Sequence, residues 1–237
     1  MRDSIPPQLR YNAPSPKRRC PINTDLIILL LLWSISFTFS LTLHEAAHAL
    51  VGKLGGDLTA YATGQVSLNP IPHMKREPMG MIVIPLVSFF IYNGGWMLGW
   101  ASAPYDPIWA ERHPRKSALM ALAGPVSNLI LFILSAIAYK MLYAFGTGMS
   151  EELFTTLAML ALIMYKLNLI LALFNFIPLP PLDGAEIILL FFPENQASMV
   201  RARIRSLGIF GLFLAWILFP YIYSPVRAFF SALLGMP

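Results

Sequence analysis

Charged residues are scarce in this chain, and cysteine is almost absent. Lys, Arg, Asp and Glu together make up 12% of the 237 residues, while hydrophobic residues make up 57%. Soluble domains carry about 25% charged residues, so the composition excludes an ordinary soluble domain. It predicts an integral, multi-pass membrane protein, which we expect in the cell membrane. The single cysteine, Cys20, excludes an internal disulfide and leaves the redox compartment open.

The sequence also lacks internal repeats and any polar stretch long enough for a second folded module. Residues 1–23 are rich in proline and polar residues and are predicted to form a disordered basic tail. The tail suits the phosphates of a lipid bilayer better than nucleic acid, so we expect no nucleic-acid partner. Residues 24–192 are expected to form the core, and residues 193–237 a basic connector followed by a C-terminal membrane helix.

Long apolar runs are the main feature that the chain does have. A helix needs about 20 residues to cross a bilayer, and several runs reach that length. We expect five or six transmembrane helices, the sixth depending on a short apolar piece after Gly184. The predicted fold is therefore an all-α polytopic membrane protein. The runs cover residues 26–43, 79–100, 117–143, 153–176, 187–192 and 207–223.

The segment Leu58–Leu68 departs from this helical pattern. Its residues, LTAYATGQVSL, alternate weakly between apolar and polar, which is typical of an edge strand or a hairpin. We therefore expect a short membrane-associated β hairpin after the first helix.

Residues 44–48 read His-Glu-Ala-Ala-His at the end of the first apolar run. Residues four apart share one face of a helix, so His44 and His48 can both bind one Zn²⁺. Glu45 stands beside that face, where it can act as a general base on a metal-bound water. The alternative is a chance group of helix polar residues. That alternative is weakened because ionisable groups at the centre of a membrane helix cost about 2.5–3.5 kcal/mol each on insertion scales.

A catalytic zinc commonly has three protein ligands, and Asp183 is the preferred third. It follows the proline-rich segment Ile177–Leu182, whose irregular backbone at membrane depth needs protein or a water-filled cavity around it. The alternative is that Asp183 caps the helix beginning at Gly184. Asp106 and Asp57 are rivals that the sequence does not favour, since Asp106 lies in a proline-rich loop and Asp57 resembles a turn residue.

Three asparagines are further candidates. Asn175 can donate to the oxygen of a tetrahedral intermediate, and donors of that kind supply on the order of 3 kcal/mol; alternatively it bonds to the last carbonyls of its helix. Asn128 and Asn168 are weaker candidates for substrate binding, and the alternative for both is a hydrogen bond between helices. His73 is expected in a loop near the entrance of the site.

Four ordered pieces of the chain resemble the site-2 protease family, peptidase family M50, in its minimal form without a PDZ or CBS domain. The combination is more specific than the histidine motif, which also occurs in soluble metalloproteases. The similarity covers roughly residues 24–192. The pieces are LTLHEAAHALVGKLGGDLTA from Leu41, GQVSLNPIPH from Gly64, MALAGPVSNLIL from Met120 and NLILALFNFIPLPPLDG from Asn168.

The resemblance implies a zinc endopeptidase that cuts transmembrane segments of other membrane proteins. By resemblance, His44, His48 and Asp183 hold zinc, Glu45 activates water, and Asn175 holds the substrate backbone or the oxyanion. The chain departs from the family in having Glu186 where members usually have arginine. Members usually work near the cytosolic face, whereas the basic tail favours a cytoplasmic N-terminus and so places the histidines on the outer side.

The predicted function is hydrolysis of peptide bonds in or near transmembrane segments, with a Zn²⁺ cofactor and a membrane-protein substrate as partner. Two alternatives stay open. One is an inactive adaptor that only binds membrane segments, and the other is a metal transporter whose histidines and carboxylates line a path. Neither the natural substrate nor the oligomeric state follows from the sequence.

Overall fold

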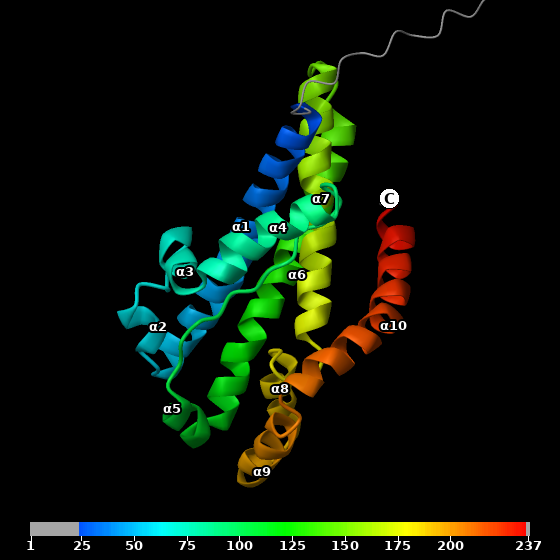
Figure 1. Cartoon of the computed structure of the whole chain (residues 1–237). Helices are drawn as coiled ribbons and strands as arrows, with labels where there is room; N and C mark the ends of the chain where they lie inside the picture. Colours follow the sequence, from blue (N-terminus) through cyan, green and yellow to red (C-terminus); the bar gives the residue numbers. More distant parts are fainter. Residues whose placement is uncertain (1–23, 236–237) are drawn as a thin grey trace, which may run out of the picture.

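The computed structural model describes residues 24–235. The predicted tail, residues 1–23, and residues 236–237 lie outside the described part. All of the regular structure in the described chain is helical (Figure 1). Its elements are α1 (Thr24–Gly55), α2 (Thr59–Ala62), α3 (Pro70–Arg76), η2 (Met79–Val83), α4 (Ile84–Ile91), α5 (Pro107–Arg112), α6 (Pro114–Phe145), α7 (Glu151–Asn175), α8 (Gly184–Ile187), η3 (Ile188–Phe191), α9 (Glu194–Arg205) and α10 (Ile209–Leu234).

Four of the described helices, α1, α6, α7 and α10, are long and apolar enough to cross a membrane. The all-α polytopic prediction is confirmed at this level, while the count of five or six spans is not. The run from Met79 forms only a π-helical turn, η2, and the eight-residue helix α4. The chain then turns at Asn93 and Gly94, whose φ angles are 50° and 78°, so the helix ends well short of a span.

The β hairpin predicted for Leu58–Leu68 is not confirmed, because residues 24–235 contain no strand. The Asp57 carboxylate accepts hydrogen bonds from the backbone N–H (2.9 Å) and hydroxyl (2.6 Å) of Thr59, which stabilises a helical turn at α2. Gly64 then reverses the chain with φ 74°. Local capping and a glycine turn outweigh the weak alternation in this segment.

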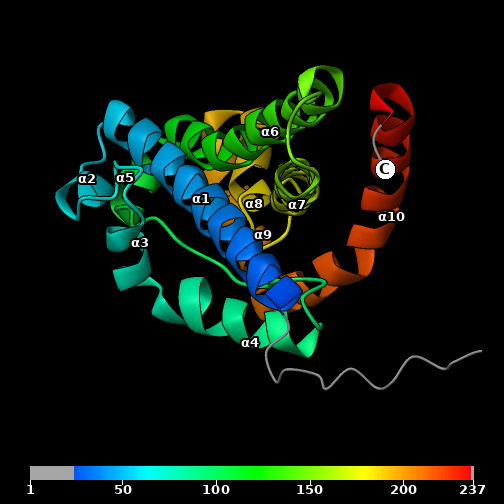
Figure 2. The same cartoon turned by 90° about the horizontal axis from the view of Figure 1, so that it is seen from above.

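The centre of the molecule is a three-helix unit of α1, α6 and α7 (Figure 2). Phe37 of α1, Leu167 of α7 and Phe89 of α4 are buried in one apolar cluster, which places α4 across the α1 side of the unit. Phe132 of α6 and Tyr165 of α7 stack at 4.6 Å between ring centroids in a second cluster. α10 packs against that second cluster along its later half, through residues that include Tyr223 and Phe230.

The short elements gather at one end of the bundle, where α1 ends and α6 begins. In Figure 1, α2 and α3 lie to the left of the lower half of α1, α5 lies at the lower end of α6, and α8 and α9 lie below α7. Buried Arg201 of α9 pairs with Glu186 of α8 at 2.8 Å and donates to the Ala110 carbonyl of α5 at 3.1 Å. These bonds join the basic connector to α8, the helix that directly follows Asp183.

Candidate metal centre

His44 and His48 lie one turn apart in the last part of α1, with their imidazoles side by side. Both are buried, and their Nε2 atoms are 2.9 Å apart. Neighbouring Glu45 is also buried, and one ligand atom from each of the three residues lies within 4.8 Å of the others. The expected helical spacing therefore brings together two nitrogens and a carboxylate.

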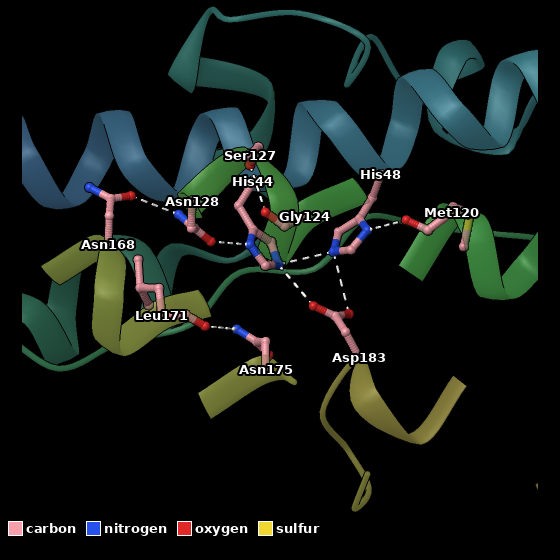
Figure 3. A network of polar contacts seen from close by, with 10 residues as sticks. All are labelled: His44, His48, Met120, Gly124, Ser127, Asn128, Asn168, Leu171, Asn175 and Asp183. Carbon is pink, nitrogen blue, oxygen red and sulfur yellow. Dashed lines mark hydrogen bonds and ion pairs between the residues drawn. The ribbon is translucent and has the colours of Figure 1, made fainter. Parts of the chain in front are cut away.

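Asp183 reaches this pair from far along the chain (Figure 3). Its Oδ2 lies 3.1 Å from Nε2 of His44, and its Oδ1 lies 3.3 Å from Nε2 of His48. Asp183 stands at the start of α8, but its side chain makes no capping hydrogen bond there. The carboxylate faces the imidazoles instead, so the structure favours the ligand interpretation over the cap.

Two glycines make this meeting possible. A Cβ atom on Gly124 of α6 would collide with the Nε2 atoms of both His44 and His48. A Cβ atom on Gly184 would collide with the backbone oxygen of Ile177, so the start of α8 packs directly on the chain leaving α7. The first glycine keeps the space in front of the nitrogens open, and the second brings Asp183 within reach.

The donor set fits a divalent metal. Nδ1 of His48 lies 2.7 Å from the Met120 carbonyl, which can only accept, so this nitrogen carries the proton. In neutral His48 the Nε2 lone pair then faces the Asp183 carboxylate, which is also only an acceptor. Acceptors at this distance need a positive charge between them, which is either a proton on the imidazole or a metal ion. Two imidazole nitrogens and a carboxylate are a ligand set that zinc uses in catalytic sites.

The electrostatics of Asp183 agree with this assignment. Burial alone would raise the pKa of its carboxyl, but the charge that His48 carries when it is protonated outweighs burial and lowers the pKa below its usual range. Asp183 is therefore ionised, as a metal ligand must be.

The three asparagines lie close to this centre, but they differ in what they contact. Asn128 Oδ1 contacts Nδ1 of His44, and Asn168 contacts Asn128 in turn. Asn175 ends α7 and donates to the Leu171 carbonyl at 3.0 Å, which matches its alternative as a helix-end residue. It makes no hydrogen bond to His44, His48 or Asp183 in the described structure.

The rival carboxylates serve other purposes. Asp57 accepts from the backbone N–H of Asp106 at 2.9 Å, and Asp106 caps α5 through the N–H of Ile108 at 2.8 Å. His73, expected in an entrance loop, is buried on α3 with Nε2 3.1 Å from the Ser67 carbonyl.

Sequence reasoning missed the Met120 carbonyl and the role of Gly124. A backbone carbonyl has no signal in the sequence. Gly124 stands in the AGPVSN piece, and a glycine within an apolar helical run was the available hint of a close approach.

Comparison with known proteins matches residues 32–219 to the model of peptidase family M50. The chain is 36% identical over 186 residues to a protein of Bacillus subtilis (strain 168) that carries the name zinc metalloprotease YwhC, covering 78% of each chain. It is 32% identical over 165 residues to a protein of Mycobacterium tuberculosis named zinc metalloprotease Rip2, covering 69% of this chain and 59% of the relative. No solved structure matches.

Proposed function

The chain belongs to peptidase family M50, and on that premise we propose that it is a zinc endopeptidase that hydrolyses peptide bonds in or near transmembrane segments of other membrane proteins. The observation that carries this proposal is the approach of Asp183 to His44 across 139 positions of sequence. Ionisable groups are costly within an apolar bundle, and a buried cluster of acceptors is explained by a bound cation. His44, His48 and Asp183 would hold the metal.

The chemistry divides between the metal and the side chains. Bound zinc supplies a Lewis acid that polarises a carbonyl and lowers the pKa of water towards about 7. Glu45 takes the proton from the attacking water and later delivers it to the leaving amine. Asn175 is proposed to donate to the developing oxyanion, and to do so its amide must turn from the Leu171 carbonyl.

A groove beside α1 is the proposed docking place for the substrate. It has a volume of about 350 Å³ and is lined by residues that include Thr38, Thr42 and Leu68. Thr42 is buried, and its hydroxyl has no hydrogen-bond partner. Thr38, Thr42 and Glu45 follow one another at spacings of four and three, so they share one side of the helix. An unwound transmembrane segment, with backbone groups needing partners, suits this strip of hydroxyls.

The groove proposal is tested with Thr42→Val, which keeps the shape and removes the hydroxyl. We expect a higher KM for a model transmembrane substrate with little change in kcat, because a docking contact is lost. Thr156→Val, at the far end of α7, is the matched control. If the KM of Thr42→Val equals that of the wild type, the Thr42 hydroxyl does not take part in substrate binding.

The central experiment compares wild type with Glu45→Gln in zinc content per chain and in cleavage of a membrane substrate. We expect both proteins to hold zinc and only the wild type to cleave, because Glu45 is the base and not a required ligand. Wild type without zinc after careful purification contradicts the proposal. Zinc without cleavage in the wild type points to an adaptor, and metal flux into liposomes points to a transporter.

We propose that residues 24–192 form the catalytic core and that residues 193–237 supply the connector and the last membrane helix. The bond between Arg201 and Glu186 supports a close association of the two parts. The cell membrane is the proposed location.

A further inference from the structure

We propose that Asn168 and Asn128 are positioning residues that set the tautomer of His44, so that its Nε2 lone pair faces the metal position. The inference rests on the proposed function, because it assigns these residues to a zinc site. It replaces the substrate contact expected for both asparagines with a role inside the protein.

The series of hydrogen bonds begins at the side-chain amide of Asn168, whose oxygen and nitrogen can be told apart from their partners. The side-chain amide nitrogen of Asn168 donates to the Met164 carbonyl at 2.8 Å and to the Ser40 hydroxyl at 2.9 Å. The carbonyl can only accept, so this end of the Asn168 amide must be the NH₂ group. Its oxygen therefore points the other way, towards Asn128.

The next two bonds follow from the first. The Asn168 oxygen accepts from the amide nitrogen of Asn128 at 2.8 Å. The Asn128 oxygen is thereby turned to Nδ1 of His44. Because an amide oxygen only accepts, Nδ1 must carry the hydrogen, and Nε2 of a neutral ring keeps its lone pair. Figure 3 shows the series from Asn168 through Asn128 to His44.

Burial fixes the orientation of each amide in this series. Ser40, Asn128 and Asn168 are each 0% exposed, so water cannot replace a mismatched contact. Turning the Asn168 amide would set its oxygen against the Met164 carbonyl and its NH₂ against the NH₂ of Asn128, while turning the Asn128 amide would set two amide oxygens face to face. Each such contact leaves an unsatisfied buried polar group. The two histidines thus reach the same tautomer by different routes: His48 through the Met120 carbonyl, and His44 through two amides anchored on the Met164 carbonyl.

The same hydrogen bonds favour a positioning role for the two asparagines over substrate binding. Both donor hydrogens of Asn168 are used by Met164 and Ser40, and its oxygen is used by Asn128. A substrate could contact these amides only by breaking the series. Partners that orient a metal-binding imidazole commonly change metal affinity about 10- to 100-fold when removed.

The first test measures zinc affinity by chelator competition in Asn128→Leu and Asn128→Asp. We expect Asn128→Leu to bind zinc about 10- to 100-fold more weakly. Asn128→Asp should retain more of the affinity, because a carboxylate still accepts from Nδ1. Ser135→Ala is the matched control, since it removes another buried polar group of α6, a hydroxyl that donates to the Leu131 carbonyl of its own helix. Equal zinc affinity in Asn128→Leu and wild type would overturn the inference.

The second test is independent of metal and activity. Nitrogen NMR of labelled histidines in the metal-free protein reports which ring nitrogen carries hydrogen. We expect Nδ1–H at His44 in wild type and a mixture or the other tautomer in Asn168→Leu, which touches no ligand directly. A wild-type His44 whose Nδ1 carries no hydrogen contradicts the inference. If wild type shows Nδ1–H but binds no zinc, the proposed function fails while the series itself stands.

Discussion

Gly124 is the residue on which the approach of α6 to the histidines most directly depends. Its hydrogen leaves free the space in front of both Nε2 atoms, where a methyl group would collide with them. Glycine in a helix costs about 0.5–1 kcal/mol relative to alanine. Gly124 therefore lowers the stability of α6 but keeps the space beside the two imidazoles open.

Gly124→Ala is expected to abolish zinc binding while the helices still form. The new methyl group would occupy the side of the imidazoles that the metal needs. The measurement is zinc per chain, with circular dichroism to follow the fold. Gly52→Ala on α1 is the matched control, because its methyl group meets only the side chain of Met120. Zinc content in Gly124→Ala equal to that of the control would show that the space is not used.

At the scale of elements, ion pairs attach α8 to α9. Glu186 is bound by Arg201 through its Nη2 at 2.8 Å and by Arg205 at 3.0 Å, both from α9. Glu186 thus has two basic partners in the connector. Because α8 directly follows Asp183, we expect these ion pairs to help hold the carboxylate in place.

Arg201→Met is expected to destabilise the protein and weaken zinc binding together. Removing one partner of a buried ion pair leaves an uncompensated charge, which commonly costs about 3–5 kcal/mol. Arg115→Met is the matched control, since its pair with Glu194 is 62% exposed on both sides and is worth at most about 1 kcal/mol. Thermal unfolding in detergent and chelator competition measure both effects. If Arg201→Met is destabilised but keeps wild-type zinc affinity, the ion pairs of the connector do not influence the metal site.

At the scale of the whole molecule, charge is distributed unevenly between the two ends of the bundle. The connections at the site end are rich in Lys and Arg, while the connection between α6 and α7 has neither, the nearest being Lys140 inside α6. Positive charge in short connections marks the cytoplasmic side. The described chain therefore favours a cytoplasmic site, against the orientation suggested by the basic tail. The site-end residues are Lys53, Lys75, Arg76, Arg112, Arg115, Lys116, Arg201, Arg203 and Arg205.

Topology can be tested with single cysteines, because Cys20 is the only native one. In a Cys20→Ser background, we expect exposed Lys75→Cys to be protected from a membrane-impermeant thiol reagent on intact cells. Exposed Gly148→Cys, between α6 and α7, should be labelled because it lies at the opposite end. The reverse labelling pattern would place the site on the outer side.

Some features were predictable because they depend on local spacing. The helical pairing of His44 with His48 follows from four residues of sequence, and the membrane location follows from composition. The hairpin at Leu58–Leu68 was not confirmed, since the hydrogen bonds from Thr59 to Asp57 and a glycine turn acted more strongly than weak alternation. The count of five or six spans was not confirmed, and hydropathy does not register the π-helical turn and the reversal at Asn93 that shorten the second run.

The sequence by itself determined which groups could bind a metal and that they would lie in a helical membrane protein. Only the tertiary structure decided that Asp183 meets the histidines, that Gly124 opens the space beside them, and that two buried amides orient His44. The reason is physical. Side-chain spacing along one helix is set by its own backbone, whereas contacts between distant segments depend on how closely helices pack and on which hydrogen bonds remain possible once water is excluded.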